Sequence, residues 1–98
     1  MIRRIVKMSF HPDKVETFKK VYSANWNRIR TFDGCTHLEL LQDEFNPSIF
    51  FTYSLWESEE HLQRYRKSDV FATVWSATKM HFNERPEAWT VKLLDFDQ

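Results

Sequence analysis

The sequence predicts an α+β fold of the ferredoxin-like type, a sandwich with strands and helices in the order β-α-β-β-α-β. Three observations lead to this prediction. Stretches of alternating apolar residues, which are typical of strands, stand near both ends of the chain and at two places in its middle. Apolar residues at three- and four-residue steps, which are typical of one helix face, follow the first and the third of these stretches. Proline, glycine and asparagine residues mark the junctions.

The first strand is expected over residues 2–10, where Val6, Met8 and Phe10 alternate with polar residues. Pro12 then suits a helix start, because its fixed φ and missing N–H are tolerated in the first turn. The helix that follows has one largely apolar face, which consists of Val15, Phe18, Tyr22, Asn25, Ile29 and Phe32. Gly34, the only glycine, is expected just past the helix end, where a left-handed residue closes a helix at little cost.

The third strand carries apolar side chains on both faces, and this predicts a partner. A second strand is expected over residues 35–44, and Asn46-Pro47 marks the turn before the third. In the third strand one side holds Ile49, Phe51, Tyr53 and Leu55, and the other holds Phe50 and Trp56. Helices cover only one face of such a sheet, so the other face needs a cover from outside the chain. A twofold homodimer, sheet against sheet, is the simplest answer.

Serine caps organise the second half of the chain. Ser58, followed by two glutamates, starts a helix directly after the third strand. Ser68-Asp69 is expected to cap a second helical segment that breaks or offsets the first. Pro86 is expected to end the helical region, after an apolar face that consists of Phe71, Val74, Trp75, Thr78 and Phe82. The fourth strand is expected over residues 88–96, with Trp89, Val91 and Leu93 on one side.

The composition excludes several classes of partner. Lys plus Arg and Asp plus Glu both number 14, so no net field attracts nucleic acid or anionic lipid. No stretch approaches the ~20 apolar residues of a membrane span, and the first residues lack the features of a signal peptide. Cys35 is the only cysteine, which excludes an internal disulfide and suits a reducing cytoplasm. We therefore expect one cytoplasmic domain over residues 1–98, with no nucleic acid or membrane as partner.

Short motifs at the junctions carry a family resemblance. They are Gly34-Cys35 at the opening of the second strand, Asn46-Pro47 before the third, and Trp56-Glu57-Ser58 at the switch from strand to helix, continued by Leu62, Ser68 and Phe71. Through these motifs the chain resembles the antibiotic-biosynthesis-monooxygenase superfamily, including its quinol-monooxygenase-like members, over nearly its whole length. The resemblance implies two ferredoxin-like protomers that pack their sheets into a dimeric α+β barrel. It also implies a pocket in each protomer between sheet and helices.

The resemblance further implies a chemistry. Some members oxidise phenolic polycyclic substrates with molecular oxygen through substrate carbanion chemistry, without metal or flavin, while others act on quinols, degrade haem or isomerise a small sugar-like signal. A cofactor-independent monooxygenase that acts on a small aromatic or quinol-type molecule is therefore our leading hypothesis, and we expect no cofactor.

The chain departs from many relatives at three positions. Where they have a glutamate and two histidines, this sequence has Ser54, Tyr65 and Val70. A carboxylate and two imidazoles are natural proton-handling groups. Their replacement favours an alternative hypothesis, a non-catalytic dimer of the same fold that binds an apolar small molecule or has a regulatory role.

The expected substrate pocket consists of Tyr22, Asn25, Trp26, Ser54, Trp56, Tyr65 and Trp75. Two of these residues are candidate catalytic residues. Asn25 is either a core amide bonded to a neighbour or a group that orients a substrate carbonyl. Tyr65 can donate a hydrogen bond to a substrate oxygen, although a phenol with a pKa of ~10 is a poor base unless perturbed. Trp56 and Trp75 either pack the core or wall a flat aromatic ligand.

His37 is the third catalytic candidate, because an imidazole titrates near neutrality. By the period of two it shares a strand face with Cys35 and Glu39, although such neighbours are often merely exposed. His61 is expected to be an exposed residue in a first helical turn, and His81 to lie at a helix end.

We expect no metal site, because the four histidines and Cys35 show none of the spacings typical of metal ligands. The first strand has no asparagine, and the haem-degrading subgroup uses one there. This argues against haem degradation.

Overall fold

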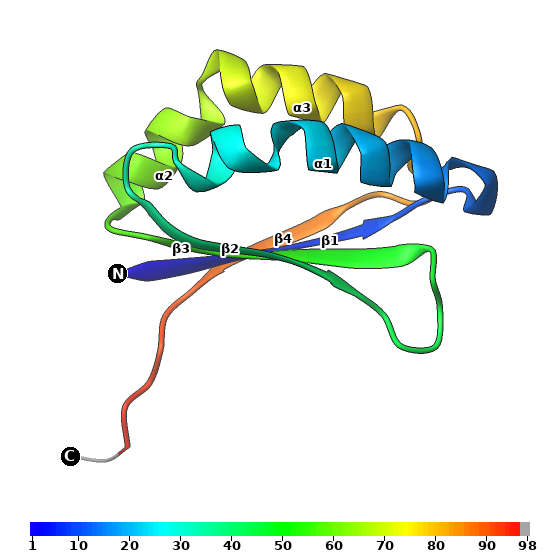
Figure 1. Cartoon of the computed structure of the whole chain (residues 1–98). Helices are drawn as coiled ribbons and strands as arrows, with labels where there is room; N and C mark the ends of the chain where they lie inside the picture. Colours follow the sequence, from blue (N-terminus) through cyan, green and yellow to red (C-terminus); the bar gives the residue numbers. More distant parts are fainter. Residues whose placement is uncertain (97–98) are drawn as a thin grey trace.

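Residues 1–96 are described by a computed structural model, and they form two layers, a four-stranded sheet and helices packed on one of its faces (Figure 1). The elements in chain order are β1 (Ile2–Ser9), the 3-10 turn η1 (Pro12–Lys14), α1 (Val15–Arg30), β2 (Cys35–Gln42), β3 (Ile49–Trp56), α2 (Glu59–Arg66), α3 (Asp69–Lys79) and β4 (Glu87–Val91). The strands are antiparallel in the order β2-β3-β1-β4. The predicted ferredoxin-like α+β fold is confirmed.

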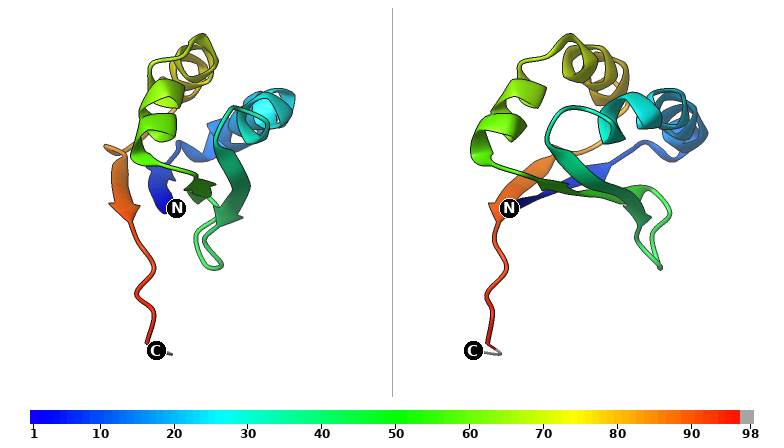
Figure 2. Two further views of the ribbon diagram at one scale, coloured as in Figure 1. Left: turned by 90° about the vertical axis from the view of Figure 1, so that its left-hand side faces the viewer. Right: turned by 60° about the vertical axis from the view of Figure 1, so that its left-hand side comes forward.

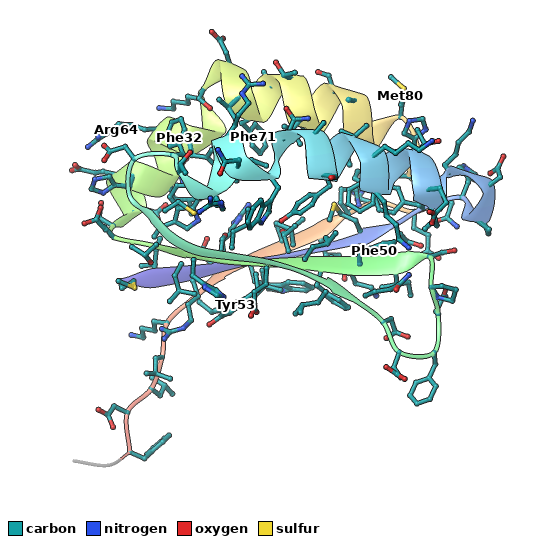
Figure 3. All side chains as sticks on the ribbon, viewed as in Figure 1. Phe32, Phe50, Tyr53, Arg64, Phe71 and Met80 are labelled. Carbon is teal, nitrogen blue, oxygen red and sulfur yellow. The ribbon has the colours of Figure 1, made fainter. Side chains whose placement is uncertain are left out.

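The pairing of β1 with β3 decides which side chains face the helices. The register runs from Ile2 opposite Trp56 to Ser9 opposite Ile49. Phe50 and Trp56 are 2% and 1% exposed under the helices. The odd-numbered residues of β3 therefore lie on the uncovered face, and Figure 3 shows Tyr53 on the side of the sheet away from the helices. The two-faced apolar character predicted for this strand is confirmed.

Aromatic rings fill the core between α1 and the middle of the sheet. The ring centroids of Phe10 and Phe18 are 4.2 Å apart, and those of Phe18 and Phe50 are 5.1 Å apart. Met8 and Val15 complete this cluster together with Tyr22. Large buried rings contribute most of the apolar area that a small domain removes from water.

The predicted local signals at the helix ends are confirmed. The Ser58 hydroxyl accepts a hydrogen bond from the His61 N–H at the start of α2, and the Ser68 hydroxyl accepts one from the Phe71 N–H at the start of α3. Gly34 has a φ of +89°, in the left-handed region. A Cβ at this position would also overlap the side chain of His61.

β1 and β2 end one and two residues earlier than predicted, and two other boundaries differ by several residues. The helical region ends at Lys79, well before Pro86, because the chain turns back so that Phe82 forms a bridge with Phe10. β4 ends at Val91 instead of residue 96, and Leu93 lies outside it. Val91 pairs with Arg3, and only Ile2 of β1 lies beyond that pair. Figure 2 shows this segment running away from the helical layer.

None of the helices within residues 1–96 combines the length and the apolar character needed to cross a membrane.

Candidate functional site

A cavity of about 330 Å³ lies between the sheet and the helices. All four strands contribute side chains to its floor, and α1, α2 and α3 contribute to its walls and roof. Small-molecule sites typically measure ~300–1,000 Å³ and are mostly apolar with a few polar groups. The cavity therefore has the size and the lining of a site for one small molecule.

One wall of the cavity is a continuous set of aromatic contacts. Trp56 and Tyr65 stack with their ring centroids 4.9 Å apart and an interplanar angle of 27°. Phe71 contacts the edge of Tyr65 at 5.3 Å and stacks on Trp75 at 5.7 Å. Phe32 approaches Tyr65 at 5.4 Å, and Figure 3 shows Phe32 and Phe71 in the helical layer. Flat apolar walls of this kind favour a planar aromatic ligand.

A polar row of the sheet contributes Arg4 and Ser54 to the floor of the cavity. In the strand register Arg4 stands opposite Ser54 on one side and opposite Thr90 on the other. The Arg4 guanidinium donates a hydrogen bond to the Thr90 hydroxyl at 2.9 Å. The buried Ser54 hydroxyl accepts one from the indole N–H of Trp56 at 3.0 Å. Because that bond uses only a lone pair, the Ser54 O–H can still donate to a ligand.

Two phenols, those of Tyr22 and Tyr65, line the cavity. The Tyr22 hydroxyl is buried and has no hydrogen-bond partner within residues 1–96. Burial, followed by the nearby Cys35, raises the pKa of Tyr22. Burial also raises the pKa of Tyr65, with smaller contributions from Tyr22 and Cys35. Both phenols therefore stay protonated at neutral pH and can act as hydrogen-bond donors, whereas neither can act as a base.

The structure brings together five of the seven expected pocket residues, namely Tyr22, Ser54, Trp56, Tyr65 and Trp75. Asn25 and Trp26 do not line the cavity. The Asn25 amide donates to the Val21 carbonyl at 2.8 Å and accepts from Arg28 at 3.2 Å, so its polar atoms are used along α1. Trp26 is 42% exposed, and the Arg30 guanidinium lies over its ring.

His37 lies on the uncovered face of the sheet, away from the cavity. A bulge between Cys35 and His37 shifts the register, so Cys35 pairs with Trp56 and His37 with its neighbour Leu55. The prediction that Cys35 and His37 share a face is therefore wrong, because the bulge breaks the period of two. His37 and Glu39 do share a face, and the imidazole Nε2 lies 3.2 Å from the carboxylate. Burial raises the pKa of the Cys35 thiol, which makes it a poor nucleophile at neutral pH.

Three side chains with possible metal-ligand atoms lie close together beside Gly34, although their positions in the sequence do not predict it. Asp33, Glu57 and His61 each place a ligand-type atom within 4.8 Å of the others. The Arg64 guanidinium pairs with Asp33 at 3.3 Å, and the Ser58 hydroxyl lies 2.7 Å from Nδ1 of His61. His61 is partly buried, contrary to the expected exposed position, because the missing side chain of Gly34 leaves room for its ring.

Arg4 and Arg66 are the functional candidates that sequence reasoning missed. Both line the cavity. The signal for Arg4 was present, because it lies on the same strand face as Val6 and Met8. Arginines are usually solvated at the surface, so the strand pattern alone does not single out Arg4 as a cavity residue.

Comparisons with known proteins match this architecture. The family model described as "Antibiotic biosynthesis monooxygenase" matches residues 1–75. A crystal structure of an antibiotic biosynthesis monooxygenase superposes with a TM-score of 0.91 at 15% identity, covering 97% of this chain and 100% of that one. A conserved protein from Methanosarcina mazei Go1 has a TM-score of 0.88 at 22% identity, with 93% and 90% coverage. Rv0793 from Mycobacterium tuberculosis has a TM-score of 0.88 at 15% identity, with 99% and 98% coverage. None of the curated proteins matches the chain.

Proposed function

Because the chain belongs to the antibiotic biosynthesis monooxygenase family, we propose that it is a cofactor-independent monooxygenase acting on a small aromatic or quinol-type molecule. The observation that carries this proposal is the cavity itself, in which protonated hydroxyl donors stand beside an aromatic wall. Tyr65, Ser54 and Tyr22 supply these donors.

The aromatic wall orients the substrate and excludes water from it. A planar ring system packs against Trp56, Tyr65 and the other rings of the wall, which bury its apolar surface. In a site from which water is excluded, a hydrogen bond to a developing negative charge is stronger than it is in solvent.

The reaction is driven by the substrate's own ionised form. A substrate with an acidic CH₂ group beside an aromatic ketone gives a proton to solvent before it enters the cavity and binds as the enolate, and Tyr65 and Ser54 donate hydrogen bonds to the enolate oxygen. Solvent returns one proton to the peroxide that forms later. Electron transfer to O₂ and formation of a C–O bond give a hydroperoxide. Loss of water from the hydroperoxide leaves a new carbonyl group. The balance is one CH₂ and one O₂ converted to one C=O and one H₂O.

Oxygen uptake with anthrone as substrate tests this proposal. We expect purified, chelator-treated protein to consume oxygen faster than buffer, with formation of the quinone. Tyr65→Phe and Ser54→Ala each remove one donor and are expected to slow the reaction by about 10-fold or more, the usual cost of losing a donor to an oxyanion. Tyr53→Phe is the matched control, because Tyr53 lies on the uncovered face and bonds to Arg3. Uptake no faster than background, or equal loss in the control, would contradict the proposal.

A second function is favoured by one observation. Of the described residues that line the cavity, none carries a carboxylate or an imidazole, so no general base faces the ligand. A dimer that binds an aromatic molecule without converting it has no need for such a base. Tight binding of anthrone without oxygen uptake would identify the protein as a binding or regulatory protein.

We also propose that the protein is a homodimer through the uncovered face of the sheet. Figures 1 and 2 show every helix on the other face. The uncovered face holds Ile5, Phe51 and Leu55, and at its edges Leu41 is 47% and Trp89 45% exposed. An apolar area of this kind resembles the core of an obligate interface more than a solvated surface.

We also propose a cytoplasmic location for the protein. Its cysteine, Cys35, is free, and a free thiol suits a reducing compartment.

A further inference from the structure

Two guanidinium groups face the cavity from opposite layers. Arg4 comes from β1 in the floor, and Arg66 is the last residue of α2 in the roof. Both residues line one cavity. Burial and then the charge of Arg66 lower the pKa of Arg4, while the charge of Glu59 acts in the opposite direction. Both groups nevertheless remain charged at neutral pH, because an arginine keeps its proton in proteins.

Neither guanidinium is neutralised by a close partner. Within residues 1–96, no carboxylate lies within 4.0 Å of Arg4 or Arg66. Arg4 donates one N–H to the neutral Thr90 hydroxyl, and its other N–H groups have no hydrogen-bond acceptor in the described part of the chain. Two like charges next to an apolar cavity repel each other, and an anion placed between them removes that cost.

The groups around the pair also suit an anion. Ser54 stands directly opposite Arg4 in the strand register, and both residues line the same cavity. Tyr22, also in the lining, is nine-tenths buried, and its hydroxyl has no partner within residues 1–96. Both hydroxyls can donate a hydrogen bond, and within residues 1–96 no acceptor bonds to either O–H. A ligand oxygen with negative charge satisfies donors that are otherwise left without partners.

We propose that Arg4 and Arg66 form an anion subsite, and that the cavity takes a planar aromatic monoanion. The acidic oxygen group of the ligand lies between the two guanidinium groups, and its rings lie against Trp56 and Tyr65. This inference rests on the proposed function, because it specifies the substrate class of the same cavity. It also explains how a site without a carboxylate or imidazole can work, since a substrate that arrives ionised needs no base.

Calorimetric titration with a matched pair of probes tests the subsite. Naphthoate and naphthamide have the same shape, and only naphthoate carries a charge at neutral pH. We expect the protein to bind naphthoate about 10-fold or more tightly than naphthamide, the effect of a charge-assisted hydrogen bond. Arg66→Gln is expected to reduce this preference to about 3-fold or less, and Arg4→Gln to do the same, because bidentate recognition needs both groups.

Arg28→Gln is the matched control, because Arg28 is exposed on α1 and its guanidinium bonds to Asn25 outside the lining. It removes the same charge and is expected to keep the preference for naphthoate. Circular dichroism checks that each variant is folded. Arg66→Gln is the variant expected to disturb folding least, because Arg66 is exposed at a helix end.

The outcomes separate the two levels of the proposal. Equal binding of both probes, or equal losses in Arg66→Gln and Arg28→Gln, would overturn the anion subsite and leave the proposed function standing. If neither probe binds, the subsite is refuted, and the proposed aromatic site then depends on anthrone uptake alone.

Discussion

Replacing Tyr22 with phenylalanine is expected to stabilise the free protein. The Tyr22 hydroxyl is shielded from solvent, and no group within residues 1–96 accepts or donates a hydrogen bond to it. In the unfolded chain the same hydroxyl is hydrated. Folding removes this hydration, and no hydrogen bond within the protein replaces it. The phenylalanine ring keeps the packing against Phe18, whose ring centroid lies 6.0 Å away.

The magnitude follows from the cost of an unsatisfied polar group. A buried donor without a partner costs about 1–3 kcal/mol, and we expect Tyr22→Phe to recover about 1 kcal/mol of unfolding free energy. For a domain of 60–100 residues, 1 kcal/mol raises Tm by roughly 4–8 °C. Thermal unfolding followed by circular dichroism, at one fixed protein concentration and without ligand, measures the shift.

Tyr65→Phe is the matched control for this experiment. The Tyr65 ring packs in the same aromatic wall, but its hydroxyl is not among the fully shielded, unpartnered groups within residues 1–96. Its removal is therefore expected to change the unfolding free energy by about 0.5 kcal/mol or less. A Tyr22→Phe variant with an unchanged or lower Tm would refute the reasoning. The same variant is expected to bind naphthoate more weakly, because the ligand uses the hydroxyl that the free protein leaves unsatisfied.

Three further predictions concern backbone, pH and assembly. Gly34→Ala is expected to lower the unfolding free energy by about 2–3 kcal/mol in urea titrations, because its φ is positive and the added Cβ would overlap the Cβ and ring of His61. The loss should be smaller in a His61→Gly background, which removes the whole His61 side chain, and an equal loss there would contradict the overlap. Because folding raises the pKa of Tyr22 and Tyr65 above the unfolded value of ~10, their contribution to stability should be constant below pH ~10 and fall above it, by up to ~1.4 kcal/mol per pH unit for each tyrosine. The Cys35 thiol, whose pKa burial also raises, should add a separate fall that begins near its unfolded pKa of ~8.5. Alkaline urea titrations should show a shallower fall in Tyr22→Phe, and an identical slope would contradict the assignment. Phe51→Lys, on the uncovered face, should give a monomer at micromolar concentration in sedimentation experiments, where the unmodified protein sediments as a dimer; a monomeric unmodified protein would rule out the dimer.

The local signals in the sequence predicted most of the fold. Period-two alternation identified the strands, and the caps at Ser58 and Ser68 are local hydrogen bonds between residues three apart. The two wrong boundaries depend on tertiary contacts instead. β4 ends opposite Arg3, next to the first residue of β1, and α3 ends shortly before Phe82, which forms a bridge with Phe10. No pattern within either segment carries that information.

The residues of the candidate site, like the fold, were predictable in part from the sequence. Helical spacing and strand alternation place Tyr22, Trp56 and Tyr65 toward the core, and the structure brings them to one cavity. The bulge after Cys35 reversed the face of His37, and a bulge has no dependable signature in a single sequence. Arg4 lies on a strand and Arg66 at the end of a distant helix, so only folding brings their charges into interaction.

The most direct measurement is a crystal structure of the protein with naphthoate. We predict that the rings lie in the cavity against Trp56 and Tyr65, with the carboxylate within hydrogen-bond distance of Arg4 and Arg66. A cavity filled by the protein's own side chains, or naphthoate found only on the uncovered face of the sheet, would contradict the assignment of this cavity as the site.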